Sequence, residues 1–123
     1  MEEINLGSSS KYESEIERSV AHMLTQMGLN FEYSERGPYD FRINGKDDVM
    51  FLELKGSLTH SSRNILKKII SRLEILTSET ERSSALIVSS EPIPSKFQDF
   101  ASDKVKLMDL KAFRDFIRSW SQA

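Results

Sequence analysis

Apolar positions recur along the chain with two spacings, one helical and one typical of strands. Helical spacing predicts amphipathic helices at residues 12–27, 63–77 and 110–120. Short apolar stretches between the helices predict strands, or in the first case an extended connector, at residues 29–33, 40–43, 49–55, 85–89 and 105–108. Helices that alternate with strands favour an α/β sandwich with a mixed central sheet flanked by helices.

The apolar stripe of each helix identifies candidate core residues. In the first helix these are Tyr12, Ile16, Val20, Met23, Leu24 and Met27, with Gly28 as the C-cap. In the second helix they are Ile65, Leu66, Ile69, Ile70, Leu73 and Leu76. A step of about 100° per residue places Glu13 near the centre of the first stripe, Glu17 at its border and His22 well away from it.

The stretch 49–55 is apolar except near its end, where it carries Glu53 and Lys55. A buried strand seldom contains unpaired charges, because removing a charge from water is costly. Residues two apart in a strand face the same side, so these two side chains share a face. We therefore expect them to be paired with each other or to be functional.

Asp40 stands upstream of this stretch, at the start of the preceding strand. Residues 44–48 are rich in turn formers and predict a hairpin. Pairing of Asn44 with Val49 would place Asp40 opposite Glu53, with Cβ atoms about 4.5–5.5 Å apart. Two carboxylates at this distance repel each other unless a proton or a cation lies between them. A divalent metal ion fits this position.

A second triplet of the form acid-x-Lys, Asp109-Leu110-Lys111, shows that such a triplet is weak evidence alone. Asp109 follows the apolar stretch 105–108 and directly precedes the last helix, so an N-cap role explains it. Glu53 differs in its strand setting and in its expected proximity to Asp40.

The combination of Asp40 with Glu53-Leu54-Lys55 resembles the PD-(D/E)xK nuclease superfamily, which has the restriction-endonuclease-like fold. The order of elements in that fold covers nearly all of this chain. The small size and the Glu17–Arg18 pair on the first helix look most like archaeal Holliday-junction resolvases. The chain departs from the family in one place, because Pro38 and Asp40 are separated by one residue where the family has a Pro-Asp dipeptide.

The resemblance implies a three-layer sandwich and a Mg²⁺-dependent endodeoxyribonuclease that cuts DNA, with branched or junction DNA among its substrates. Asp40, Glu53 and the Leu54 carbonyl would be ligands of Mg²⁺ or Mn²⁺, ions that prefer oxygen ligands. Lys55 would be catalytic, and Glu17 would complete the site, with Glu13 as its alternative. Glu17 could equally be an ordinary residue at the rim of a solvated helix.

Several basic residues are candidates for contacts with DNA phosphates: Arg36, Arg42, Arg63, Lys67 and Lys68. The first two flank Asp40, and the others lie, in a cluster with Arg72, on the helix that begins soon after Lys55. The same residues could form only a solvated helix face, so both interpretations stay open. No aromatic residues alternate with them, so stacking of bases is not indicated.

Composition limits the compartment and the cofactors. The chain has 123 residues, a formal charge of −2 and no cysteine, which excludes disulfides and thiolate metal sites. We expect a flexible lead-in at residues 1–11 and a single domain at 12–123. Because no apolar run could span a membrane and no signal sequence is recognisable, we expect a cytoplasmic protein. The chain has no P-loop and no Rossmann motif, so we expect no nucleotide cofactor.

A homodimer is expected, because two symmetric phosphates of a duplex or junction are matched most simply by a two-fold dimer. The last helix offers Phe113, Phe116, Ile117 and Trp120 as interface material, although these residues could instead cover the sheet. Two alternatives to a nuclease remain. One is a catalytically silent nuclease-fold module that binds nucleic acid or a protein partner. The other is a structural protein in which Glu53 and Lys55 form only a salt bridge.

Overall fold

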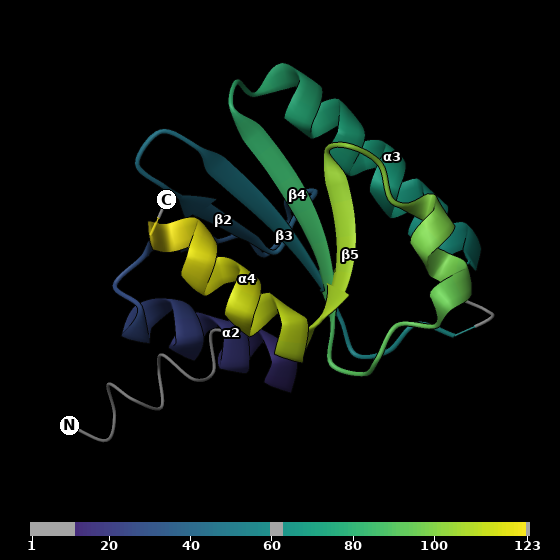
Figure 1. Ribbon diagram of the computed structural model, residues 1–123, viewed down its shortest axis with the longest axis horizontal. Helices are drawn as coiled ribbons and strands as arrows, with labels where there is room; N and C mark the ends of the chain where they lie inside the picture. Colours follow the sequence, from purple (N-terminus) through teal and green to yellow (C-terminus); the bar gives the residue numbers. More distant parts are fainter. Residues whose placement is uncertain (1–11, 60–62, 123) are drawn as a thin grey trace.

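A computed structural model describes residues 12–59 and 63–122 and contains a five-stranded sheet with helices on both faces (Figure 1). The strands lie in sequence order: β1 (Asn30–Tyr33), β2 (Phe41–Asn44), β3 (Val49–Lys55), β4 (Ser83–Ser89) and β5 (Val105–Asp109). The pairs β1–β2 and β2–β3 are antiparallel, whereas β3–β4 and β4–β5 are parallel. The expected α/β class with a mixed sheet is confirmed. The predicted lead-in at residues 1–11 lies outside the described residues.

The helices form a layer on each side of the sheet. Helices α2 (Glu15–Gln26) and α4 (Leu110–Gln122) lie together on one face, and α3 (Arg63–Glu79) lies on the other with the short 3₁₀ helix η2 (Ser95–Phe100) (Figure 1). Within the ranges 12–59 and 63–122, no helix is both long enough and apolar enough to cross a membrane.

Strand β3 divides the core between the two layers. Met50, Leu52 and Leu54 belong to the apolar cluster beneath α2 and α4, whereas Phe51 belongs to the cluster beneath α3 and η2. Successive side chains of a strand point to opposite faces. Glu53 and Lys55 therefore lie on the α3 side of the sheet, on the same face as predicted.

Helix α2 begins later than the apolar stripe suggested, at Glu15. Ser14 is its N-cap, and the Ser14 Oγ accepts a hydrogen bond from the Glu17 N–H at 3.3 Å. At the other end Gly28 has a φ of 71°, the left-handed conformation that glycine adopts without steric cost. The Leu29 N–H then closes the helix by donating to the Leu24 carbonyl at 3.1 Å.

The predicted core position of Ile65 in α3 is wrong. Its side chain is 56% exposed, whereas Leu66, Ile69 and Leu73 are buried beneath the helix. Ile65 precedes Leu66 by one residue and so points about 100° away from the line of contact with the sheet. The sheet covers a narrower stripe of α3 than the sequence pattern suggested.

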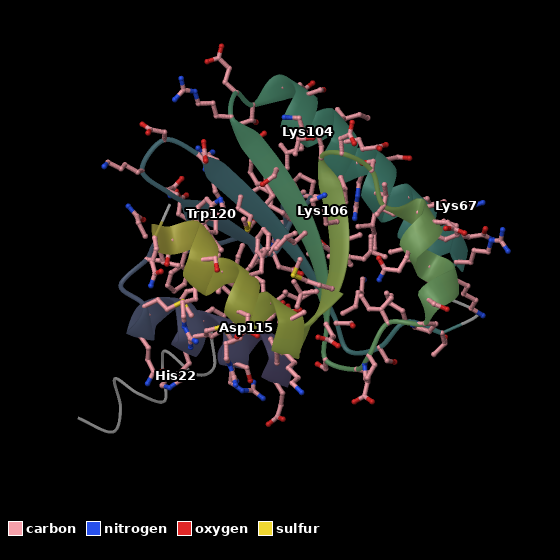
Figure 2. The ribbon with its side chains drawn as sticks, viewed as in Figure 1. His22, Lys67, Lys104, Lys106, Asp115 and Trp120 are labelled. Carbon is pink, nitrogen blue, oxygen red and sulfur yellow. The ribbon has the colours of Figure 1, made fainter. Side chains whose placement is uncertain are left out.

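The aromatic residues of α4 cover the sheet within the chain. Phe113 and Ile117 are fully buried, and Phe116 and Trp120 pack against the same cluster while remaining partly exposed. The ring of Trp120, near the end of α4 in Figure 2, lies over the β2–β3 turn. A Cβ at Gly45 would come within 2.7 Å of that ring, so glycine is required by this close approach.

Candidate functional site

The β2–β3 hairpin has the predicted register, with Asn44 opposite Val49 and Ile43 opposite Met50. A register shift of one residue would have turned every side chain to the opposite face. The prediction that Asp40 continues this ladder opposite Glu53 needs correction, because β2 begins only at Phe41.

Asp40 contacts the edge of β3 in a different way. Its N–H donates to the Leu52 carbonyl at 2.7 Å, and its Oδ2 accepts a hydrogen bond from the Leu54 N–H, also at 2.7 Å. The chain bends before Phe41, and the Asp40 carboxylate takes the place of a backbone acceptor on the β3 edge. This bond fixes the carboxylate beside the segment that carries Glu53 and Lys55.

Glu53 is a buried acid with an unusual proton affinity. Its side chain is 12% exposed, and burial together with the nearby Asp40 carboxylate raises its pKa to about 7. Lys55 and Arg72 oppose this rise, and the Lys55 Nζ lies 3.6 Å from the Glu53 Oε2. The Lys55 side chain is 34% exposed, so this ion pair lies at the boundary between core and solvent.

Asp40 shares the same electrostatic environment. Burial raises its pKa above the usual value, the hydrogen bond from the Leu54 N–H lowers it, and the charge of Glu17 raises it further. Glu17 belongs to α2, on the opposite side of the sheet from Glu53. Asp40 is therefore influenced by a carboxylate of the α2 layer and lies close to one on the α3 face.

Glu17 is more buried than its border position in the sequence suggested, with only 8% of its surface exposed. Its Oε1 accepts hydrogen bonds from the Glu13 N–H at 2.7 Å and from the Tyr33 hydroxyl at 3.0 Å. Burial is the main cause of the raised pKa of Tyr33, and the hydrogen bond to Glu17 adds to it. Glu13 itself is exposed, because it precedes the N-cap Ser14 and so lies outside the helix.

This contact of Glu17 with the N-terminal end of α2 is close to a capping box. Ser14 and Glu17 have the Ser-x-x-Glu spacing of that motif, a signal present in the sequence. Glu17 thus has a structural role in starting the helix, which accounts for one of its oxygens. Its Oε2 has no hydrogen-bond donor among the described residues.

The carboxylates partly suit a hard divalent cation. In the described part of the chain, no group of three or more His, Cys, Asp or Glu side chains is arranged to hold a metal ion by itself. However, Asp40 and Glu53 each use one oxygen in a contact with the protein, at Leu54 N–H and at Lys55 Nζ, and keep the other without a described donor. Mg²⁺ commonly binds one or two carboxylates and completes its shell with water and substrate phosphates, so this donor set fits it.

Most of the predicted phosphate-binding residues contact aromatic rings within the chain. The guanidinium of Arg42 lies 5.8 Å from the centroid of Phe51, and its Nε donates to the Asn44 Oδ1 at 3.0 Å. Arg63 and Lys67 lie 5.8 and 5.4 Å from the centroid of Phe100. Arg36 and Lys68 are exposed.

Sequence reasoning grouped Arg72 with the other basic residues of this helix as a possible phosphate contact and did not predict its effect on Glu53. Arg72 lies one turn beyond Lys68 on α3 and close enough to lower the pKa of Glu53. Phe100 was not among the predicted functional residues. Phe100 supplies the aromatic neighbour that the basic residues of α3 lack in their own segment, and no local pattern could have indicated this distant contact.

The histidine of the first helix takes no part in this site. His22 is exposed on α2 and points away from the sheet, as its wheel position predicted (Figure 2).

Comparison of the chain with protein-family models, with curated proteins and with solved structures finds no match. The resemblance to PD-(D/E)xK nucleases therefore depends on the residues of this chain alone.

Proposed function

We propose that this chain is a metal-dependent endonuclease that hydrolyses phosphodiester bonds in DNA, acts in the cytoplasm and has the restriction-endonuclease-like fold. The observation that carries the proposal is the proximity of the Asp40 and Glu53 carboxyl groups near the carboxyl-terminal end of β3. Both carboxyl groups have raised pKa values, and the Lys55 Nζ lies 3.6 Å from the Glu53 Oε2. Buried acids that repel each other are common where a protein binds a cation or a reacting group.

Mg²⁺ or Mn²⁺ would be held by Asp40, Glu53 and the Leu54 carbonyl. The Leu54 N–H points toward Asp40, and the N–H and C=O of one strand residue face the same neighbouring strand position. The remaining Glu17 oxygen is a further candidate from the α2 layer. When bound, such an ion lowers the pKa of a water molecule and neutralises charge on the phosphate.

The side chains around the carboxylates have separate tasks in this proposal. Glu53 would have to release a proton to hold a cation, because its raised pKa leaves it partly protonated near neutral pH. Lys55, whose Nζ lies 3.6 Å from the Glu53 Oε2, would orient the attacking water or stabilise the charge that builds on the phosphate. Arg72 and Lys68, one turn apart on α3, would contact neighbouring phosphates.

A second candidate function is a nuclease-fold module that binds nucleic acid or a protein partner without cutting. It is favoured by the absence of a ready-made cluster of three ligands among the described residues. It is also favoured by the Lys55–Glu53 ion pair, which already offsets part of the repulsion between the acids. In this function Asp40, Glu53 and Lys55 would only stabilise the carboxyl-terminal end of the central strand β3.

A cleavage assay on linear, nicked and four-way DNA separates the two candidates. A nuclease should cut at least one of these substrates with Mg²⁺ or Mn²⁺. Cleavage should stop in EDTA, and the Asp40→Asn variant should be inactive. The variant Asp109→Asn is the matched control, because it removes the same charge from another strand end. DNA that is bound but never cut would favour the silent module. DNA that is neither bound nor cut would contradict the nuclease and leave only a module that binds a protein partner.

We further propose that the active unit is a homodimer, since duplex and junction DNA present two symmetric phosphates. The aromatic residues of α4 pack on the sheet, so the interface would have to use other surface. Light scattering at micromolar concentration tests this. A single species near 14.1 kDa, unchanged on addition of four-way DNA, would contradict the dimer.

A further inference from the structure

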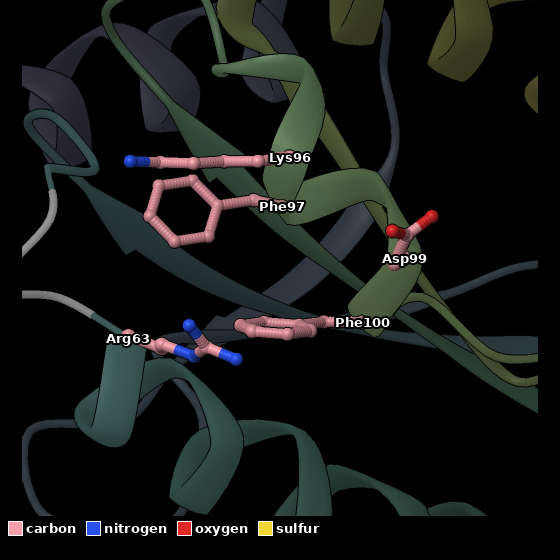
Figure 3. Close-up of a pocket in the computed structure, with 5 residues that line it drawn as sticks. All are labelled: Arg63, Lys96, Phe97, Asp99 and Phe100. Atoms are coloured by element: carbon pink, nitrogen blue, oxygen red, sulfur yellow. The ribbon is translucent and has the colours of Figure 1, made fainter.

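A pocket of 240 Å³ lies between the first turn of α3 and the helix η2 (Figure 3). It is lined by Arg63, Lys96, Phe97, Asp99 and Phe100. Arg63 comes from α3 and the other residues come from η2, so the pocket exists only because the two elements pack together. None of the carboxylates of the candidate metal site lines it.

The two phenylalanine rings form the apolar part of this pocket. Phe97 is 2% exposed and is anchored in the apolar cluster beneath α3, whereas Phe100 is partly exposed. Their centroids are 5.8 Å apart and their planes are inclined by 57°. The fixed position of Phe97 makes this wall a rigid one.

Cations are placed on either side of the rings. The Lys96 Nζ lies 5.4 Å from the centroid of Phe97, and the Arg63 guanidinium lies 5.8 Å from that of Phe100. Figure 3 shows the two cations on opposite sides of the ring pair, with the Asp99 carboxylate directed away from both. No carboxylate of the described residues forms an ion pair with Arg63. The pocket therefore combines positive charge with aromatic surface.

A nucleotide has the matching chemistry. Its phosphate can accept forked hydrogen bonds from an arginine and interact with a lysine as a point charge. Its base or sugar can lie against aromatic rings, a contact that does not depend on sequence. An acidic peptide would satisfy the cations but has no general need for the rings.

We propose that this pocket binds one nucleotide, with the phosphate at the Arg63 guanidinium and the base or sugar against the partly exposed ring of Phe100. Lys96 adds positive charge from the other side of the rings. The nucleotide belongs either to a DNA strand or to the free pool. The assignment to a DNA strand rests on the proposed nuclease function, whereas binding of a free nucleotide does not.

Binding in EDTA, where no metal-dependent cleavage occurs, tests the pocket separately from catalysis. The probe is a fluorescently labelled single-stranded oligonucleotide whose anisotropy is measured at several salt concentrations. Arg63→Gln and Lys96→Gln should each weaken binding about fivefold or more and should lower the slope of log K against log salt by about one. Both side chains are exposed, so the substitutions leave the core intact.

Lys106→Gln is the matched control. Lys106 is exposed on β5, and its neighbours Val105 and Leu107 face the α3 side, so Lys106 faces the opposite side of the sheet. This variant loses the same charge and should bind the oligonucleotide as the wild type does.

Calorimetric titration with deoxyadenosine 5′-monophosphate and with inorganic phosphate identifies the source of the nucleotide. Binding of the free nucleotide that Phe100→Leu weakens, with phosphate binding unaffected, would assign the pocket to the free pool. Binding of the oligonucleotide alone would assign it to DNA.

The outcomes separate the pocket from the nuclease activity. The pocket proposal is overturned if Arg63→Gln and Lys96→Gln bind the oligonucleotide and deoxyadenosine 5′-monophosphate as the wild type does. It is also overturned if the wild type binds neither of these two probes. Both results hold whether or not the protein cuts DNA. If the two variants lose binding but the wild type never cuts DNA, the pocket stands and the nuclease proposal fails.

Discussion

Two triplets of the form acid-x-Lys lie at the same end of the sheet, where the parallel strands β3 and β5 finish, and they have different surroundings. Strands β3, β4 and β5 are parallel, and Lys55, Ser89 and Asp109 are level with one another across them. At the end of β5 the Asp109 Oδ1 accepts a hydrogen bond from the Ala112 N–H at 2.8 Å. Asp109 therefore caps α4, as the sequence predicted.

Glu53 has no helix to cap. Helix α4 begins immediately after Asp109, whereas residues 56–62 separate β3 from α3. Glu53 lies instead in a buried position close to a second acid, Asp40, and its pKa rises to about 7. The same residue pattern thus gives a helix cap in one place and a destabilised carboxylate in the other, because a helix starts directly after β5 and a loop starts after β3.

The largest difference in effect is expected when the lysine of each triplet is replaced. Lys55→Ala should reduce DNA cleavage by about 10²–10⁴-fold, the usual cost of removing a general acid–base group. DNA binding should change little, because one phosphate contact among many is lost. Lys111→Ala should cut as the wild type does. If Lys55→Ala cleaves DNA at a rate within a few-fold of the wild-type rate, the functional distinction between the triplets is lost.

Stability against pH tests the electrostatics of Glu53 without any substrate. Its pKa rises from 4.5 when unfolded to about 7 when folded, so the folded protein binds the proton more tightly. The associated stability is present below pH 4.5 and is lost as the pH rises through 7. Glu53→Gln should therefore raise the free energy of unfolding at pH 8 by about 2–3 kcal/mol and by much less at pH 5, as measured by urea denaturation.

The control for that measurement is Asp109→Asn, which should show no such gain at pH 8 because asparagine is an equally good N-cap. A Glu53→Gln protein that is less stable than wild type at pH 8 would mean that the Lys55 ion pair outweighs burial and the repulsion by Asp40.

Metal binding should also distinguish the two strand ends. Mn²⁺ should raise the melting temperature of the wild type, and Asp40→Asn should weaken Mn²⁺ binding by about tenfold or more because an oxygen ligand is lost. Affinity should fall below about pH 7, since Glu53 must release its proton first. Equal Mn²⁺ responses in wild type, Asp40→Asn and Asp109→Asn would contradict a metal site at β3.

The smallest effect is expected at the cap itself. Asp109→Ala should lower the free energy of unfolding by about 1 kcal/mol, the typical cost of a lost N-cap, and should leave cleavage unchanged. Thermal or urea unfolding measures the first expectation. A loss of cleavage in a folded Asp109→Ala protein would place both triplets in the functional site.

The sequence could predict the hairpin register, because the turn residues after Asn44 and the apolar alternation of β3 agree on it. It could not place Asp40, since the bend before Phe41 depends on a side chain replacing a backbone acceptor. Glu17 was assigned to the site without its capping contacts, although the spacing from Ser14 signals them. Contacts between distant segments, such as Arg63 with Phe100, depend on packing that no local pattern encodes.

The hydrogen bond from the Leu54 N–H to the Asp40 Oδ2 gives the molecule an internal reporter. The resonance of one backbone amide should change whenever that carboxylate gains a proton, loses one or is taken up by an ion. An NMR spectrum of ¹⁵N-labelled protein would thus report the state of the acid through its neighbour, with no probe attached and no reaction required.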